Sequence, residues 1–315
     1  MKMKTLRTSD LSIVELQSYL NHVVAPRPIA LVSTIDKAGN VNLSPFSFFN
    51  LFSVNPPVCV FSPSRRVKDN TTKHTLQNLQ EVRECVINMV SYDMVQQTSL
   101  SSTEYPKEIN EFDKAGFTQL PSAYVKPPRV AESLVQLECI IRDIISLGDG
   151  PGAGNLVLAE VICLHMDEAI FDNDGKIMQE KLDLVARMGG DLYARATADN
   201  IFKVPKPLMQ QGMGIDKLPG YIKNSTVLTG NDLAQLANVT DMPGMDEIEN
   251  YLDTNPAIPE QMNYLRPHPD SRTSYIHQRS KTMLRNGKLE EAWLNLLAGA
   301  YYEEIIINDL INNQL

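Results

Sequence analysis

The chain has 315 residues, of which 43% are hydrophobic and 21% are charged, and its formal net charge is −9. This is the composition of a globular protein with one large domain or two smaller ones. Nucleic acids are held by many cationic contacts to phosphate, so the acidic balance argues against a nucleic-acid partner. The N-terminus lacks the apolar segment of a secretory signal, and the longest apolar run is far shorter than the ~20 residues of a membrane span. We therefore expect a cytoplasmic protein that does not associate with membranes.

Residues 23–170 are predicted to form mainly β-strands. Short apolar and β-branched runs are separated by turn signals, and many short strands of this kind favour a Greek-key-like antiparallel barrel. The predicted strands cover residues 28–36, 41–55, 56–62, 84–91, 134–145 and 155–166. Amphipathic helices are predicted at 75–82 and 92–102, and the Pro-rich segment 121–133 is expected to be an extended connection on the surface.

The composition changes after about residue 204. A Pro/Gly-punctuated segment leads into sequence with helical periodicity, and the segment 288–311 carries an apolar stripe. The stripe consists of Leu289, Trp293, Leu296, Leu297 and Ala300. We predict two domains, a β-barrel at residues 1–204 and a helical extension at 205–315 that packs on the barrel or on a dimer partner. A role of the extension as an interaction module is a further possibility.

Several familiar kinds of site are absent from the sequence. Cys59, Cys85, Cys139 and Cys163 lie in apolar strand-like runs, which favours buried, reduced thiols over redox-active or metal-binding ones. The five histidines show no metal-ligand spacing, so no metal is expected. The Gly-rich segment 148–154 is followed by a strand, whereas a phosphate loop is followed by a helix, and we predict a hairpin connection there.

A cationic window precedes the first predicted helix of the barrel. Residues 62–81 contain Arg65, Arg66, Lys68 and Lys73 among hydroxyl side chains. Such cations, together with the free N–H groups at a helix start, can bind a phosphate dianion. The absence of a Walker loop favours a single phosphate group. The alternative is a solvated basic loop.

A second window, residues 42–50, combines a strand-interrupting proline with hydroxyl, amide and aromatic side chains. Proline removes one strand hydrogen bond and leaves backbone groups unpaired. A wall of this kind would suit a flat heteroaromatic ring with donors and acceptors on its edge. The alternative is ordinary barrel core.

Five segments together resemble the flavin reductase-like family of FMN-binding split β-barrels. They are residues 26–62, 64–79, 84–90, 111–139 and 183–195. The resemblance implies a homodimer with FMN at or near the subunit interface. It also implies an oxidoreductase of the NAD(P)H-dependent flavin reductase type, which passes hydride from NADH or NADPH to N5 of FMN. An FMN-bearing electron carrier similar to flavoredoxin, reduced by a protein partner, is the alternative.

The resemblance also implies the site residues. The family's Pro-Phe-Ser turn lies along the flavin ring, and its phosphate is held at the start of the helix after the cationic loop. The cofactor-binding residues predicted in this way are Ser44, Pro45, Phe46, Ser47, Phe48, Asn50, Ser64, Arg65, Arg66, Lys73, Thr75, Gly189 and Gly190. In the helix-opening motif His74 stands where the family has an acid, so Lys68–Thr71 competes with Lys73–Thr75 for the phosphate.

Three residues are candidates for the nicotinamide side of the flavin. Arg187 and Tyr193 belong to the late motif that matches the family, and His165 lies near the end of a predicted strand. A structural turn is the alternative for the first two, and a packed strand-end histidine is the alternative for His165.

Overall fold

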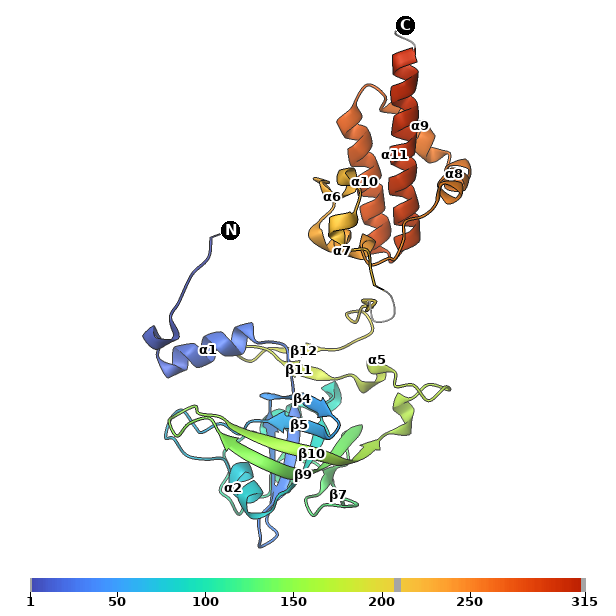
Figure 1. Cartoon of the computed structure of the whole chain (residues 1–315). Helices are drawn as coiled ribbons and strands as arrows, with labels where there is room; N and C mark the ends of the chain where they lie inside the picture. The colour runs from blue at the N-terminus through green and yellow to red at the C-terminus, as the bar shows by residue number, and fades with distance from the viewer. Residues whose placement is uncertain (1, 207–210, 313–315) are drawn as a thin grey trace. The chain divides into compact units, whose positions relative to one another are not determined.

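The computed structural model describes residues 2–206 and 211–312, with the side chains of 309–312 excepted, and its contacts divide the chain into two compact units. The units are Met1–Phe202 and Lys203–Leu315 (Figure 1). The sequence placed the domain boundary between residues 204 and 205. Among the described helices, none combines the length and the apolar character needed to cross a bilayer.

The first unit is built on a seven-stranded antiparallel sheet with the strand order β3-β2-β6-β9-β10-β5-β4. Its strands are β2 (Ala30–Ile35), β3 (Val41–Phe46), β4 (Phe49–Val54), β5 (Pro57–Phe61), β6 (Glu84–Met89), β9 (Val135–Ser146) and β10 (Asn155–Met166). Figure 1 shows β9 and β10 as two long strands that run side by side. The β-rich barrel with helices that the sequence predicts is confirmed.

Alternation along the strands produces the barrel core. On one face of β9, Leu137, Cys139 and Ile141 pack with apolar residues of β2, β5, β6 and β10. Gln136 and Glu138, which alternate with this set, face the other side. The Gly-rich segment 148–154 joins β9 to β10, which confirms the predicted hairpin connection. Of the four cysteines, Cys163 is only half-buried, so the expectation of a buried thiol is wrong at that position.

Short helices and strands complete the first unit. Helix α1 begins with a capping box between Ser12 and Glu15, was not predicted from the sequence, and buries none of its side chains. The helices are α1 (Ile13–Val23), α2 (His74–Glu81), α3 (Val95–Leu100), α4 (Glu111–Ala115) and α5 (Gln179–Leu182). Strands β1 (Arg27–Pro28), β11 (Val185–Arg187) and β12 (Tyr193–Arg195) form a three-stranded sheet, and β7 (Gln119–Leu120) pairs with β8 (Arg129–Val130).

The second unit is helical, as the sequence predicts. Its helices are α6 (Gly220–Lys223), α7 (Gly230–Leu236), α8 (Met245–Thr254), α9 (Ala257–Tyr264), α10 (Pro269–Arg285) and α11 (Leu289–Asn312). Trp293 on the predicted apolar stripe is fully buried, and its indole N–H donates to the carbonyl of Leu236 at 3.1 Å. The unit therefore has a core of its own around this tryptophan.

Candidate functional site

A cavity of about 740 Å³ opens beside strand β3 in the first unit. Its walls come from β3, α3, β11, β12 and the residues next to them. The lining residues are Ile29, Pro45, Ser47, Tyr92, Val95, Gln96, Thr98, Ser99, Ser102, Val185, Arg187, Asp191, Leu192, Tyr193, Ala194 and Arg195. This volume lies in the range of about 300–1,000 Å³ that small-molecule and cofactor sites occupy.

Strand alternation sorts the residues predicted for the ring-binding wall. Pro45 and Ser47 line the cavity, whereas Phe46 between them is buried in the barrel core, with its ring centroid 5.4 Å from that of Phe61. A strand places neighbouring side chains on opposite faces, so the three cannot share one wall. Phe48 and Asn50 do not line this cavity, and their place at the ring stays a prediction.

Strands β11 and β12 bring Arg187 and Tyr193 together as direct partners. The Arg187 guanidinium lies 4.6 Å from the centroid of the Tyr193 ring, a cation–π distance. Nearby, Arg195 stacks 3.7 Å from the Tyr92 ring centroid and makes two 2.7 Å hydrogen bonds to the Asp183 carboxylate. This wall therefore presents two arginines, each stacked on a tyrosine.

Helix α3 contributes a wall that sequence analysis did not assign to the site. Thr98, Ser99 and Ser102 line the cavity, and the buried hydroxyl of Thr98 has no hydrogen-bond partner among the described residues. A buried hydroxyl without a partner is costly. The hydroxyl side chains of the segment 98–102, which lies within the helix predicted at 92–102, are the sequence signal that could have indicated this wall.

A small polar pocket of about 20 Å³ adjoins the cavity, because Ser102 lines both. Its walls hold residues predicted for the phosphate together with several others. They are Asn42, Ser44, Arg66, Lys73, His74, Thr75, Ser101, Ser102, Thr103, Glu104, Tyr105 and Glu111. Of the two competing motifs, Lys73–Thr75 lines this pocket and Lys68–Thr71 does not.

Lys73 stands directly before helix α2 and does not cap it with its side chain. Burial and the charge of Arg66 lower the pKa of Lys73, and Glu104 offsets this only in part. Among the described residues, its ammonium group has no hydrogen-bond or ion-pair partner. It makes a cation–π contact with the Phe46 ring. A half-buried cation in this position favours an anionic ligand, and the first N–H groups of α2 add unpaired donors.

Glu104 lines the small pocket and pairs with Arg66, the second cation of the pocket beside Lys73. Its carboxylate accepts a hydrogen bond from Arg66 Nε at 2.8 Å and also pairs with Lys68. Arg66 donates in addition to the hydroxyl of Thr71 at 2.9 Å and the carbonyl of Thr72 at 2.8 Å. The pocket has about the space of one water molecule, so a phosphate requires Glu104 to move aside.

Two residues predicted for the phosphate do not line the small pocket. Arg65 donates to Asn70 through Nε and Nη2, each at 2.7 Å, and its backbone is paired with the 148–154 connection. Ser64 before it also lies outside the pocket walls. The geometry makes Arg65 a brace of the cationic loop, and Arg66 is the arginine of the pocket.

Thr75 lines the small pocket, but its hydroxyl is already engaged. It donates to Asn42 Oδ1 at 2.7 Å, and Asn42 in turn donates to the buried Glu111 carboxylate at 2.7 Å. Burial raises the pKa of Glu111, although hydrogen bonds from Leu43 and Asn42 oppose this. The chain of bonds ties α2 to β3 and α4, and thereby fixes the floor of the pocket.

Gly189 and Gly190 lie next to His22 of helix α1. A Cβ on Gly189 would lie 2.2 Å from Cδ2 of His22, on helix α1. Gly190 has a φ of +57°, in the left-handed region that favours glycine. Neither glycine lines the cavity, and Gly189 packs closely against His22 of α1.

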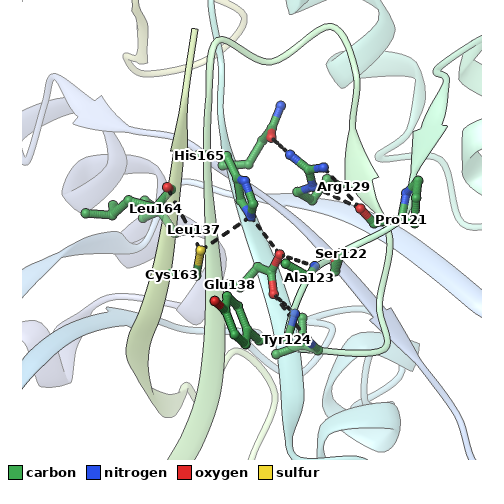
Figure 2. Close-up of polar contacts among 12 residues, drawn as sticks. Pro121, Ser122, Ala123, Tyr124, Arg129, Leu137, Glu138, Cys163, Leu164 and His165 are labelled. Carbon is green, nitrogen blue, oxygen red and sulfur yellow. Dashed lines mark hydrogen bonds and ion pairs between the residues drawn. The ribbon is translucent and has the colours of Figure 1, made fainter.

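His165 lies apart from the other two nicotinamide-side candidates. It does not line the cavity with Arg187 and Tyr193, and its Nε2 lies 2.7 Å from Oε1 of the buried Glu138. Figure 2 shows the His165 ring between Glu138 and Cys163, facing the segment 121–124. The alternative of a packed histidine near the strand end therefore describes its position better than a place at the nicotinamide.

Residues 23–181 match the family described as the flavin reductase like domain, which is half of the chain. The chain belongs to this family. The match covers β3, the cationic loop, α2 and α3, and it ends just before β11. The family's flavin-binding character therefore applies to the unit that contains the cavity and the small polar pocket.

Solved structures place this family member in the split-barrel fold. Nitrilotriacetate monooxygenase component B from Bacillus cereus is 26% identical, covers 65% of this chain and 100% of its own, and has a TM-score of 0.60. The 2-nitrobenzoate 2-nitroreductase of Pseudomonas fluorescens is 25% identical, with coverages of 67% and 100% and a TM-score of 0.59. A split-barrel protein of flavin reductase type from Shewanella frigidimarina shares the fold at a TM-score of 0.54, with 24% identity and coverages of 63% and 95%.

Sequence relatives show the same extent of similarity. An uncharacterised protein of Aquifex aeolicus is 37% identical over 182 residues, which are 58% of this chain and 90% of the relative. A second uncharacterised protein, from Halalkalibacterium halodurans, is 36% identical over 208 residues, 65% of this chain and 98% of the relative. Both alignments leave at least a third of this chain unmatched.

Proposed function

We propose that the first unit binds FMN and that the protein is an NAD(P)H-dependent oxidoreductase of the flavin reductase type. The ring system would occupy the 740 Å³ cavity and the phosphate the adjoining small pocket. The observation that carries this proposal is Lys73, a half-buried cation without an anionic partner at the start of α2. A singly phosphorylated, flat ligand suits a polar cavity that adjoins one cationic pocket, where displacement of Glu104 would make room for the phosphate.

The chain's own residues would bind and orient, because a bound flavin itself supplies the hydride-accepting chemistry. Pro45 and Ser47 offer one wall, and the hydroxyls of α3 offer donors and acceptors to the polar edge of the ring. Opposite charges attract at the small pocket, where Lys73 and Arg66 would hold the phosphate. No side-chain acid or base is needed for a hydride transfer between two bound nucleotides.

The donor, NADH or NADPH, would enter over the wall of β11 and β12. Arg187 and Arg195 provide positive charge for its phosphates, and the tyrosines on which they stack provide flat apolar surface. Stacked arginines are restricted in motion, so less side-chain entropy is lost when they bind a phosphate. The names of the two similar oxidoreductases, a monooxygenase component and a nitroreductase, agree with this class of reaction.

The proposal includes a homodimer with FMN near the interface. Strands β4 and β10 expose apolar side chains to solvent. Residues of β4, β5 and β10 also line an open apolar hollow of about 500 Å³. Helix α1 adds an exposed apolar set without burying any residue. The exposed apolar residues of these elements are Ile13, Val14, Tyr19, Leu20, Val23, Leu51, Phe52, Val54, Ile162, Leu164 and Met166. Surfaces of this kind mark protein–protein contacts.

A turnover assay separates the reductase from the electron carrier. Purified protein is mixed with FMN and either NADH or NADPH in air, and nucleotide oxidation is followed. The reductase oxidises at least one nucleotide in proportion to enzyme concentration. A protein that binds FMN tightly but oxidises neither nucleotide would be the FMN-bearing carrier that a protein partner reduces.

A further inference from the structure

A bulge in strand β10 brings three metal-binding side chains to one face of the barrel. The register between β9 and β10 shifts between Val161 and Cys163, so that Cys163 pairs with Glu138 and His165 pairs with Gln136. Leu164 between them faces the apolar hollow of β4 and β5 instead. Bulges re-aim side chains in this way. The result is a polar face on which Glu138, Cys163 and His165 meet.

The donor atoms of these three residues converge on one point. His165 Nε2 lies 2.7 Å from Glu138 Oε1 and 3.6 Å from Cys163 Sγ, and all three donor atoms lie within 4.8 Å of one another (Figure 2). A cysteine nucleophile activated by a His–Glu pair needs the thiol and the carboxylate on different ring nitrogens. Here His165 Nε2 alone faces both Cys163 and Glu138. This geometry suits three ligands around one cation and does not suit a proton relay through the ring.

The separation of the sulfur and the nitrogen matches that of two ligands of a tetrahedral cation. With bond lengths of about 2.0–2.1 Å to nitrogen and about 2.3 Å to sulfur, tetrahedral ligands are separated by about 3.6 Å for nitrogen and sulfur, which is the separation of Nε2 and Sγ. The corresponding separation of nitrogen and oxygen is about 3.3 Å. Nε2 and Oε1 are closer than this because they hydrogen-bond to each other. A small rotation of the His165 ring would open that contact.

The carboxylate is held in place by the backbone around it. Glu138 Oε1 accepts from the N–H of Ala123 at 2.7 Å, and Oε2 accepts from Tyr124 at 2.6 Å and Val125 at 3.1 Å. Metal-ligating carboxylates are commonly fixed by such secondary hydrogen bonds. Glu138 is fully buried, whereas Cys163 and His165 are half-buried. The site is therefore rigid on its inner side and accessible from outside.

We propose that Glu138, Cys163 and His165 form a binding site for a divalent cation of the zinc class. A set of one thiolate, one imidazole and one carboxylate suits borderline-soft cations and not Mg²⁺ or Ca²⁺. Binding releases the thiol proton to solvent, and the imidazole proton moves to Nδ1, which leaves Nε2 as the ligand. The thiolate and the carboxylate together balance the charge of the cation, and a water molecule completes a fourth position.

The site lies outside the flavin proposal. None of its three residues lines the cavity or the small cationic pocket. Its cation would link β9 and β10 and, through the three backbone N–H groups, the segment 123–125. Bound metal would therefore stabilise the barrel without changing the flavin site directly, and the two proposals can fail separately.

The test uses the full-length protein without an affinity tag, stripped of metal with a chelator. Co²⁺ serves as the spectroscopic probe, because tetrahedral thiolate coordination gives an intense sulfur-to-metal charge-transfer band. Zn²⁺ is then added to displace Co²⁺, and thermal unfolding is measured with and without Zn²⁺ at about 100 times its dissociation constant. The variants are Cys163→Ser and His165→Gln, and the matched control is Glu160→Gln, a half-buried carboxylate on the same strand that pairs with Arg142 and lies outside the cluster.

We expect one Co²⁺ per chain with the charge-transfer band, displaced by Zn²⁺, and a rise in the unfolding temperature of about 5–10 °C. The band is lost in Cys163→Ser. In His165→Gln the affinity for Co²⁺ falls at least about tenfold, while Glu160→Gln behaves as wild type. The far-UV circular dichroism of each variant, compared with wild type, confirms that it has folded. A wild-type protein that shows no band and no shift overturns the site, and so does a band that persists in both variants.

Discussion

The Lys73 ammonium nitrogen lies 5.4 Å from the centroid of the Phe46 ring. This contact joins the two segments that the sequence singled out, the cationic loop and the proline-interrupted strand. Phe46 faces the core, while Pro45 and Ser47 beside it line the larger cavity. The same short strand therefore supports the lysine of the small pocket and a wall of the ring cavity.

Replacement of Lys73 by alanine is expected to weaken FMN much more than riboflavin, which lacks the phosphate. Loss of a charged hydrogen bond costs about 1.5–3 kcal/mol, so FMN affinity falls about 10–100-fold. Quenching of flavin fluorescence measures both dissociation constants. Lys68→Ala is the control, because the Lys68 side chain is 63% exposed and reaches only the rim acid Glu104. Equal weakening of the two flavins by Lys73→Ala would place the phosphate elsewhere.

Glu104→Gln is expected to act in the opposite direction. The carboxylate occupies Arg66 and repels an incoming phosphate, so its neutralisation frees the arginine. The Glu104 side chain is 48% exposed, so with the dielectric constant of water the gain is about 1 kcal/mol, or roughly fivefold tighter FMN. Riboflavin binding should stay unchanged. A weaker FMN complex in Glu104→Gln would show that the acid supports the pocket and does not compete with the ligand.

Gly189→Ala is expected to lower the free energy of unfolding by about 1–3 kcal/mol, because the added methyl group collides with His22. The double variant with His22→Ala should recover much of the loss, and urea unfolding of the four proteins gives the coupling energy. Gly150→Ala, where a methyl group meets no atom within 4 Å, is the control. Additive effects of the two substitutions would show that α1 does not pack on Gly189.

Asp36 should make the stability of the barrel sensitive to acid. Hydrogen bonds from Asn40, and the nearby Lys107, lower the pKa of Asp36 from 3.8 to about 2. The folded-state pKa lies below the unfolded one, so the ionised carboxylate stabilises the fold at neutral pH. That contribution is lost as the pH falls from 3.8 toward about 2. Urea midpoints of Asp36→Asn should lie below wild type at pH 7 and converge with it near that lower limit. Asp199→Asn, at an exposed position, should follow the wild-type curve throughout.

Deletion of residues 205–315 should leave a folded protein that still takes up FMN. Among the described residues, the helical unit has a core around Trp293, and the barrel has a core built from residues of β2, β5, β6, β9 and β10. Circular dichroism and flavin titration of the shortened chain measure the outcome. Loss of FMN binding in a truncated protein that is still folded would mean that the helical unit contributes to the flavin site.

The sequence predicted the strands well because their apolar alternation is a local property. Leu137, Cys139 and Ile141 show the period of two that the structure confirms, and the helix after Lys73 follows from Leu76 and Leu79 at spacing three. The cationic window placed Arg66 and Lys73 close together, the family resemblance added Thr75, and all three line one pocket in the structure.

The remaining features depend on contacts between distant segments. Nothing near Gly189 in the sequence shows that His22 covers it. The cluster of Glu138 with His165 depends on a single bulged position in β10, which shifts the register by one residue. A strict alternation of side chains along β10 does not predict this register shift. The spacing of the residues in the sequence therefore gave no sign of a metal site.

Anaerobic mixing of the FMN-loaded, full-length protein with NADH and, separately, with NADPH tests the central claim most directly. The visible absorbance of the bound flavin is followed in a closed cuvette, and dithionite is added at the end to define full reduction. The account predicts that at least one nucleotide bleaches the flavin to the dithionite level. A flavin that stays oxidised with both nucleotides, yet is bleached by dithionite, would contradict it.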